Sequence, residues 1–188
     1  MAKILDVAQF IYDELGWVDA WRLEKLTYYA DSWFSAWYGE PLFNDNFEAW
    51  VDGPVAPVLY HANKGRDSFM SRNLPQGDGS ALLPREAAAI VSVLDFYGSW
   101  SKERLIEQTH KEKPWLEARE GFGKHARSNR VISEETTMRF YARCEAKGHQ
   151  VPRRPFDGRP NWSTEDVRAT FVANTARWAE AIALLADR

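Results

Sequence analysis

The feature that most constrains the fold is an aromatic-rich stretch spanning residues 22–61, because side chains of this size need packing partners on several sides. Its first half is predicted to form one long helix, from about Ala20 to Tyr38. Within one narrow arc of this helix fall Leu23, Leu26, Ala30, Trp33, Phe34 and Trp37. Trp21 and Tyr28 project from nearly the opposite side. We therefore expect the helix either to be sandwiched within its domain or to offer one side to a partner.

The second half of the stretch combines aromatic residues with turn formers. We expect a short extended segment over Phe47–Val51, a turn at Asp52-Gly53 and a short helix that begins at about Pro54. Proline is tolerated in a first helical turn, because the N–H that it lacks would be unpaired there. In a strand, Glu48 and Asp52 would share one face with Trp50, which lies midway between them. We interpret these acids as a polar face toward solvent, a turn or a partner.

The rest of the chain is predicted to be mainly α-helical. Apolar spacing and cap residues indicate helices at residues 4–15, 84–97, 102–111, from 114 onward and from 134 to about 144. We expect residues 1–144 to form a compact single-domain helical bundle with one small extended element. Residues 145–188 are expected to form a Pro- and Arg-rich strap and then a C-terminal helical appendage. That helix either packs back on the domain or contacts the partner.

Composition excludes several classes of protein. No apolar run approaches the ~20 residues that a membrane span needs. The net charge of −3 argues against strong nucleic-acid binding, and the single cysteine, Cys144, fits a cytoplasmic, reducing environment. Residues 1–60 contain three Lys or Arg and ten Asp or Glu, whereas the remainder contains 21 and 17. This acidic half would speed encounter with a basic partner, although a solvated surface explains it equally well.

No catalytic or metal-binding constellation is recognisable. The four histidines include no close pair at metal-ligand spacing, and nothing around Cys144 suggests an activated thiol. His110 is expected near a helix end, where a protonated imidazole is favourable. A structural hydrogen bond from His110 to the segment at Pro114-Trp115 is the preferred interpretation. The basic loop at residues 121–129 can cradle an anion, but a flexible turn is preferred there. We expect no enzymatic activity, cofactor or metal.

The order of several short blocks identifies a resemblance. The blocks are Leu23, Lys25, Leu26, Tyr28-Tyr29-Ala30, Trp33, Ala36-Trp37, Gly39-Glu40-Pro41-Leu42-Phe43, Phe47-Glu48-Ala49-Trp50, Gly53-Pro54-Val55, Pro57, Leu59-Tyr60, His110, Pro114-Trp115, Ala118, Ser128-Asn129 and Ile132-Ser133. Together they resemble the Panacea antitoxin domain, whose family includes SocA-like and phage-associated proteins. The resemblance covers roughly residues 4–143, so the domain that we expect at 1–144 is Panacea-like.

The resemblance implies an antitoxin that binds and neutralises a cognate protein toxin encoded in the same operon. An alternative function is that of a proteolysis adaptor, which delivers the toxin to an ATP-dependent protease. A further alternative is a DNA-binding regulator or an uncharacterised enzyme. Seven family motif positions are expected around the partner contact: Trp50, Asp52, Gly53, Val55, Tyr60, His110 and Trp115. The sequence does not indicate the oligomeric state.

Overall fold

The computed structural model describes residues 1–66 and 70–155. This part is mainly helical with one small antiparallel sheet, as the sequence predicts. The C-terminal helix expected within residues 163–186 lies outside the described residues. No helix of the described part is both long enough and apolar enough to cross a lipid bilayer.

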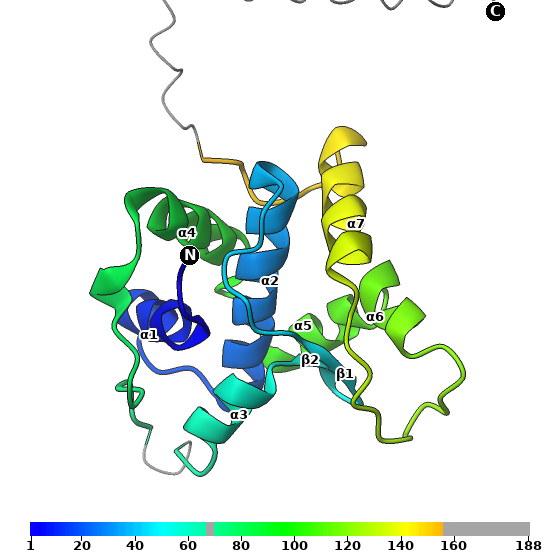
Figure 1. The fold of residues 1–188 in the computed structure, drawn as a ribbon, viewed down its shortest axis with the longest axis horizontal. Coiled ribbons are helices and arrows are strands. Elements are labelled where there is room, and N and C mark those ends of the chain that lie inside the picture. Colours follow the sequence, from blue (N-terminus) through cyan, green and yellow to red (C-terminus); the bar gives the residue numbers. More distant parts are fainter. Residues whose placement is uncertain (67–69, 156–188) are drawn as a thin grey trace, which may run out of the picture. The chain divides into compact units, whose positions relative to one another are not determined.

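Helix α2 (Ala20–Tyr38) is the centre of the fold. On one side it packs against α1 (Ile4–Leu15) and α4 (Pro84–Tyr97), and on another against α7 (Glu134–Ala146) (Figure 1). Asp19 caps α2 by accepting a hydrogen bond from the Arg22 backbone N–H at 3.1 Å. Gly39 ends it in a left-handed conformation with φ of 75°. Tyr28 and Trp33, on different sides of α2, are both buried, so the helix is sandwiched within its domain along most of its length, whereas Trp21 in its first turn is 44% exposed.

The remaining helices are short; three of them lie near the small sheet, and the 3-10 turn packs against α1. They are α3 (Pro57–Asn63), a 3-10 turn η2 (Gly79–Ala81), α5 (Lys102–Thr109) and α6 (Lys113–Ala118). The helix expected to begin at about Pro54 begins at Pro57 instead, because residues 53–55 form a strand. The helix expected to reach residue 111 ends at Thr109.

The sheet is a hairpin of β1 (Glu48–Trp50) and β2 (Gly53–Val55), joined by a two-residue turn. Trp50 pairs with Gly53, and Glu48 with Val55. A distant segment extends the pairing on the far side of β1, since the Ala49 N–H donates to the Arg130 carbonyl at 2.9 Å. The turn residues are Val51 and Asp52, one position earlier than the sequence suggested. The single expected extended segment is thus a two-stranded sheet.

Aromatic side chains fill the core between α2, α4 and α7. Tyr29 stacks on Tyr97 with ring centroids 4.1 Å apart, and Trp33 packs against Tyr141 at 5.0 Å. A buried carboxyl, Glu112, joins this cluster by accepting hydrogen bonds from the hydroxyls of Tyr29 (3.2 Å) and Tyr141 (2.6 Å). The core therefore combines a large apolar burial with one polar network whose members are mutually satisfied.

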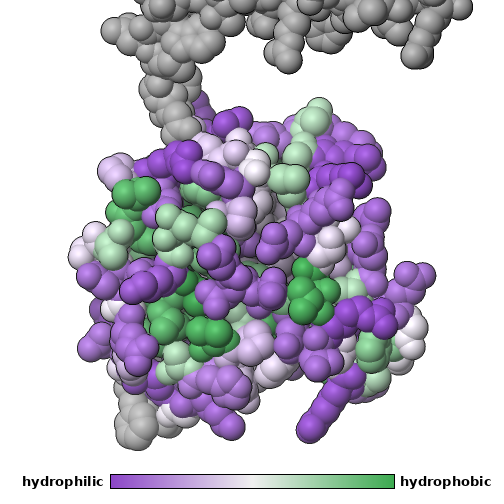
Figure 2. All heavy atoms as spheres, in the orientation of Figure 1, coloured by the Kyte–Doolittle hydropathy of each residue, from purple (hydrophilic) through white to green (hydrophobic). Residues whose placement is uncertain are grey.

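The described part of the strap runs along the bundle. The Arg153 carbonyl accepts a hydrogen bond from the Ser92 hydroxyl, and the Arg154 guanidinium lies 5.3 Å from the centre of the Tyr38 ring. Polar side chains cover much of the face shown in Figure 2, where hydrophobic residues form separate patches. Isolated apolar residues of this kind are normal on a globular protein and indicate no binding site by themselves.

The Glu112 network predicts a pH-dependent stability. Burial raises the pKa of Glu112 from 4.5 to about 7, so folding favours the protonated carboxyl. The stability that this raised pKa contributes is fully present below pH 4.5. As the pH rises through about 7, the free energy of unfolding falls by up to about 3 kcal/mol. Glu112→Gln should reduce the dependence of the unfolding free energy on pH between pH 5 and 8, measured by urea denaturation, while other buried carboxyls such as Asp31 keep part of it. The exposed control Glu120→Gln should leave it unchanged, and equal slopes in both variants would contradict this.

Candidate functional site

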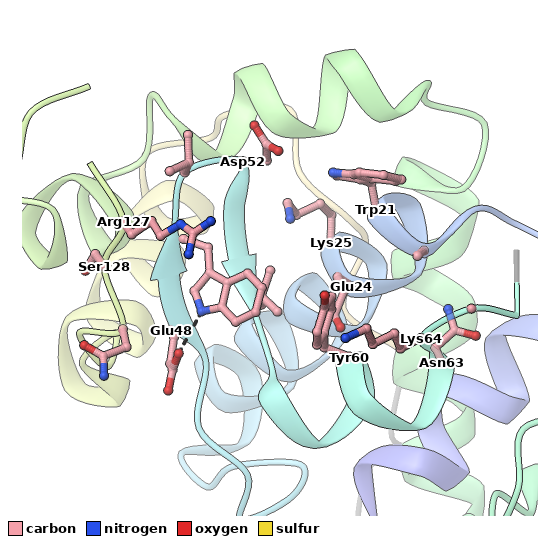
Figure 3. A pocket seen from close by; sticks show the side chains of 16 residues that line it. Trp21, Glu24, Lys25, Glu48, Asp52, Tyr60, Asn63, Lys64, Arg127 and Ser128 are labelled. Atoms are coloured by element: carbon pink, nitrogen blue, oxygen red, sulfur yellow. Dashed lines mark hydrogen bonds between the residues drawn. The ribbon is translucent and has the colours of Figure 1, made fainter. Parts of the chain in front are cut away.

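A surface pocket of about 830 Å³ lies beside the hairpin (Figure 3). Its walls come from the first turns of α2, from the hairpin, from α3 and the residues after it, and from the segment 127–129. The lining residues are Ala20, Trp21, Glu24, Lys25, Glu48, Trp50, Val51, Asp52, Val55, Tyr60, Asn63, Lys64, Gly65, Arg127, Ser128 and Asn129. A pocket of this volume is within the range of ligand-binding sites.

Two consecutive charged residues of α2 attach the hairpin to the helix. The Lys25 ammonium donates to the Pro54 carbonyl at 3.0 Å, and the Glu24 carboxylate accepts from the Ala56 N–H at 2.9 Å. Pro54 has no N–H and so suits the edge of a sheet. Because these side chains occupy the edge of β2, they take the place that a further strand would have. The base of the pocket is therefore fixed to the central helix.

Burial sets the electrostatics of this pair. Both side chains are buried, with exposed fractions of 5% for Glu24 and 0% for Lys25. Burial raises the pKa of Glu24 to about 7, and the hydrogen bond from Ala56 and the charge of Lys25 oppose that rise. Burial lowers the pKa of Lys25 to about 8, and the nearby carboxylates of Glu24 and Asp52 oppose that fall. Each charge thus makes the burial of the other less costly.

Aromatic rings form the upper walls of the pocket. Trp50 meets Tyr60 edge to face, with centroids 5.0 Å apart, and its indole N–H donates to Glu48 at 2.7 Å. Trp21 is 44% exposed, and the Lys102 ammonium lies 5.2 Å from its ring centre. These large side chains are held in place yet only partly buried. Tyrosine and tryptophan in such positions are common anchors of protein interfaces.

His110 and Trp115 lie behind the hairpin and do not line the pocket. Their rings stack with centroids 4.0 Å apart, and the Trp115 indole N–H donates to the Trp50 carbonyl at 3.0 Å. Burial, followed by the charge of Lys25, lowers the pKa of His110. The expectation of a favourable protonated imidazole at this helix end is therefore wrong, and the contact of His110 with Trp115 is ring stacking rather than the hydrogen bond that was preferred from the sequence. The two residues brace the hairpin from the rear.

Arg119, which is 6% exposed, positions the loop that brings residues 127–129 to the pocket wall. Its guanidinium donates to the Ala49 carbonyl of β1 at 3.3 Å and to the carbonyls of Gly123 (2.9 Å) and Ala126 (2.8 Å). These bonds tie the basic loop at 121–129 to the hairpin. The expected flexible turn is thus anchored by a buried arginine. The Gly123 and Ala126 carbonyls of this loop point toward Arg119. This arrangement does not favour an anion site made of the backbone N–H groups of the loop.

Four of the seven expected contact residues come together at the pocket: Trp50, Asp52, Val55 and Tyr60. Gly53 is buried beneath them, against Lys25. Glu24, Lys25, Lys64 and the segment 127–129 also line the pocket but were not predicted from the sequence as contact residues. One signal was available, since the adjacent Glu24 and Lys25 stand between Leu23 and Leu26, two apolar residues of the arc that was expected to face the core.

The described residues contain no cluster of His, Cys, Asp and Glu suited to a metal ion. Cys144 is half-buried on α7, and burial raises the pKa of its thiol. A raised pKa disfavours the reactive thiolate.

Comparison with known proteins places the pocket in a family context. The model of the family "Antitoxin SocA-like, Panacea domain" matches residues 23–116, which include the hairpin and most of the pocket lining. Antitoxin SocA of Caulobacter vibrioides (strain NA1000 / CB15N) is 34% identical over 104 residues, covering 50% of this chain and 55% of that protein. The chain thus spans about half the length of this curated relative. No solved structure matches the chain.

The hairpin geometry predicts a specific role for Gly53. Its φ is +100°, and a Cβ there would lie 2.6 Å from the Lys25 Cε and 2.7 Å from the Thr109 hydroxyl. Gly53→Ala should therefore displace the hairpin from α2. Gly121→Ala is the matched control, because Gly121 has φ of +84° but no atom within 4 Å of the position that a Cβ would occupy. Chemical denaturation should show a loss larger by about 1–3 kcal/mol for Gly53→Ala. Equal losses would contradict a steric requirement at Gly53.

Proposed function

We propose that this chain, which belongs to the SocA-like, Panacea-domain antitoxin family, neutralises a cognate protein toxin by binding it directly over the pocket beside the hairpin. The observation that carries the proposal is the aromatic wall of Trp50 and Tyr60, partly exposed and braced from behind. Such a surface is already ordered before a partner arrives. Binding therefore costs little side-chain entropy.

The proposal divides the seven expected residues into two groups. Trp50, Asp52, Val55 and Tyr60 are assigned to the toxin contact, because all four line the pocket. Gly53, His110 and Trp115 are assigned to the frame that holds the hairpin in place. The partner is expected to be encoded beside this chain and the pair to act in the cytoplasm.

Direct binding is favoured over chemistry for two reasons. The rings of the pocket are supported by fixed contacts, such as the 2.7 Å hydrogen bond from the Trp50 indole to Glu48. The group closest to a catalytic candidate, His110, is engaged in stacking behind the hairpin and has a lowered pKa. Both features suit a surface that covers another protein.

Rescue of growth tests the proposed function. Expression of the adjacent toxin gene should arrest growth, and this chain should restore growth and co-purify with the toxin in stoichiometric amounts. Trp50→Ala and Tyr60→Ala should each weaken the complex by about tenfold or more, because truncated aromatic anchors typically cost over 1 kcal/mol. The control Leu116→Ala removes a side chain that is 48% exposed but outside the pocket, and it should retain full rescue.

Growth arrest despite co-expression would overturn the proposal. Toxin lifetime in the same cells separates neutralisation from delivery to a protease. We expect an unchanged lifetime; a shortened one, abolished when the ATP-dependent protease is deleted, would support the adaptor instead.

A second prediction concerns the catalytic alternative. His110→Phe keeps a ring to stack on Trp115, and Cys144→Ser keeps the size of the side chain while removing the thiol. Both variants should rescue growth as well as the unmodified chain does. Loss of rescue in a variant with normal unfolding free energy and normal toxin affinity would indicate catalysis.

A further inference from the structure

The edges of the small sheet determine how a partner can bind to the hairpin. An extended peptide adds to a sheet where the backbone N–H and C=O groups of an edge strand are unpaired. In an antiparallel pair, alternate residues direct these groups away from the neighbouring strand. Here the outward-facing residues are Ala49 of β1 and Pro54 of β2, which lie opposite each other and bond to residues outside the hairpin.

Both edges are already occupied by the protein itself. The Ala49 N–H donates to the Arg130 carbonyl at 2.9 Å, and the Ala49 carbonyl accepts from the Arg119 guanidinium at 3.3 Å. On the other edge, Pro54 has no N–H, and its carbonyl accepts from the Lys25 ammonium at 3.0 Å. A peptide that extended the sheet would have to displace these bonds. The hairpin therefore favours a partner that is recognised through side chains rather than through its backbone.

Three aromatic rings are available for such recognition. Trp21 of α2 is 44% exposed, and Trp50 of β1 and Tyr60 of α3 are half-buried. Figure 3 shows Trp21 and Tyr60 projecting into the pocket from their two helices. Val51 and Val55 add apolar surface to the same lining. An aromatic side chain that enters the pocket would bury its ring against groups from three elements of the fold.

The charges of the pocket favour an uncharged occupant. The lining contains three carboxylates and three cations, which are Glu24, Glu48, Asp52, Lys25, Lys64 and Arg127. Their formal charges cancel. A charged side chain that entered would lose its hydration without a net opposite charge to compensate for that loss. The charge complement of this lining is therefore an uncharged side chain, and the rings favour an aromatic one.

From the occupied sheet edges and the neutral, aromatic lining we propose that the toxin inserts an uncharged aromatic side chain between Trp21, Trp50 and Tyr60 and does not pair its backbone with the hairpin. This rests on the proposed function and specifies the mode of contact. It adds Trp21 to the residues assigned to the toxin contact. It also implies an affinity that depends little on salt, because opposite charges do not carry the contact.

Blocked tripeptides test the inference with the full chain. The probe is acetyl-Ala-Phe-Ala-amide, and its analogues carry Glu, Lys or Ala in place of the Phe. Binding is followed by NMR on the indole N–H signals of Trp21 and Trp50. The Phe peptide should bind at least about tenfold more tightly than each analogue, with equal affinity at low and high salt. Equal or tighter binding of any analogue, or no shift of either signal at about 20 mM Phe peptide, would overturn the inference.

A methylated peptide separates side-chain insertion from strand pairing. Methylation of the Phe backbone nitrogen removes an N–H that strand pairing would use and keeps the ring. The methylated peptide should shift the same two indole signals, with an affinity within about threefold of that of its parent. Loss of binding on methylation would indicate pairing through the backbone and contradict the inference.

Matched variants locate the ring contact at Trp21. Trp21→Ala should weaken binding of the Phe peptide by about tenfold, followed on the Trp50 indole signal, and Trp21→Phe should restore most of the affinity. Leu116→Ala removes a side chain of similar exposure (48%) outside the pocket and should leave the affinity unchanged. Equal losses in Trp21→Ala and Leu116→Ala would contradict a contact at this ring.

The peptide experiment and the growth rescue fail independently. Rescue by a chain that does not prefer the Phe peptide would overturn this inference and leave neutralisation standing. A preference for the Phe peptide in a chain that rescues nothing would overturn the proposed function and leave the pocket chemistry intact.

Discussion

The candidate site depends on the attachment of the hairpin to the central helix through two buried, oppositely charged side chains. Glu24 and Lys25 hydrogen-bond the backbone on either side of Val55 and so close the edge of β2. A single buried charge at this place would cost several kcal/mol, whereas an adjacent opposite charge and a backbone partner offset much of that cost. The pair fixes which faces of Trp50 and Tyr60 meet solvent. The shape of the candidate site is thus a consequence of how the sheet edge is closed.

A second buried cation completes the site from the other side. Arg119 joins the β1 backbone to the loop at 121–129, and this brings the segment 127–129 to the rim of the pocket. Both cations donate to backbone carbonyls, so the hairpin is held to α2 on one side and to the loop on the other. Trp21, Trp50 and Tyr60 remain partly exposed at the opening of this frame, as aromatic anchors of protein interfaces do.

The sequence predicts the helices well and the site only in part. The bounds of α1, α2 and α4 follow from local signals, such as the Asp19 cap and Gly39. The second strand was missed because Pro54 suits a helix start and a sheet edge equally, and only tertiary pairing decides between them. The contribution of residues 127–129 was missed because it arises from contacts of Arg119 with both β1 and the loop, which no local pattern encodes.

The central claim is that this protein acts by binding its partner over the pocket beside the hairpin. Hydrogen–deuterium exchange of the chain alone and in complex with the adjacent gene product tests this most directly. We predict added protection confined to residues 48–65 and 127–129 and to the first turns of α2. Protection elsewhere, for example along α1 and α4, with unchanged exchange around the pocket, would contradict the claim.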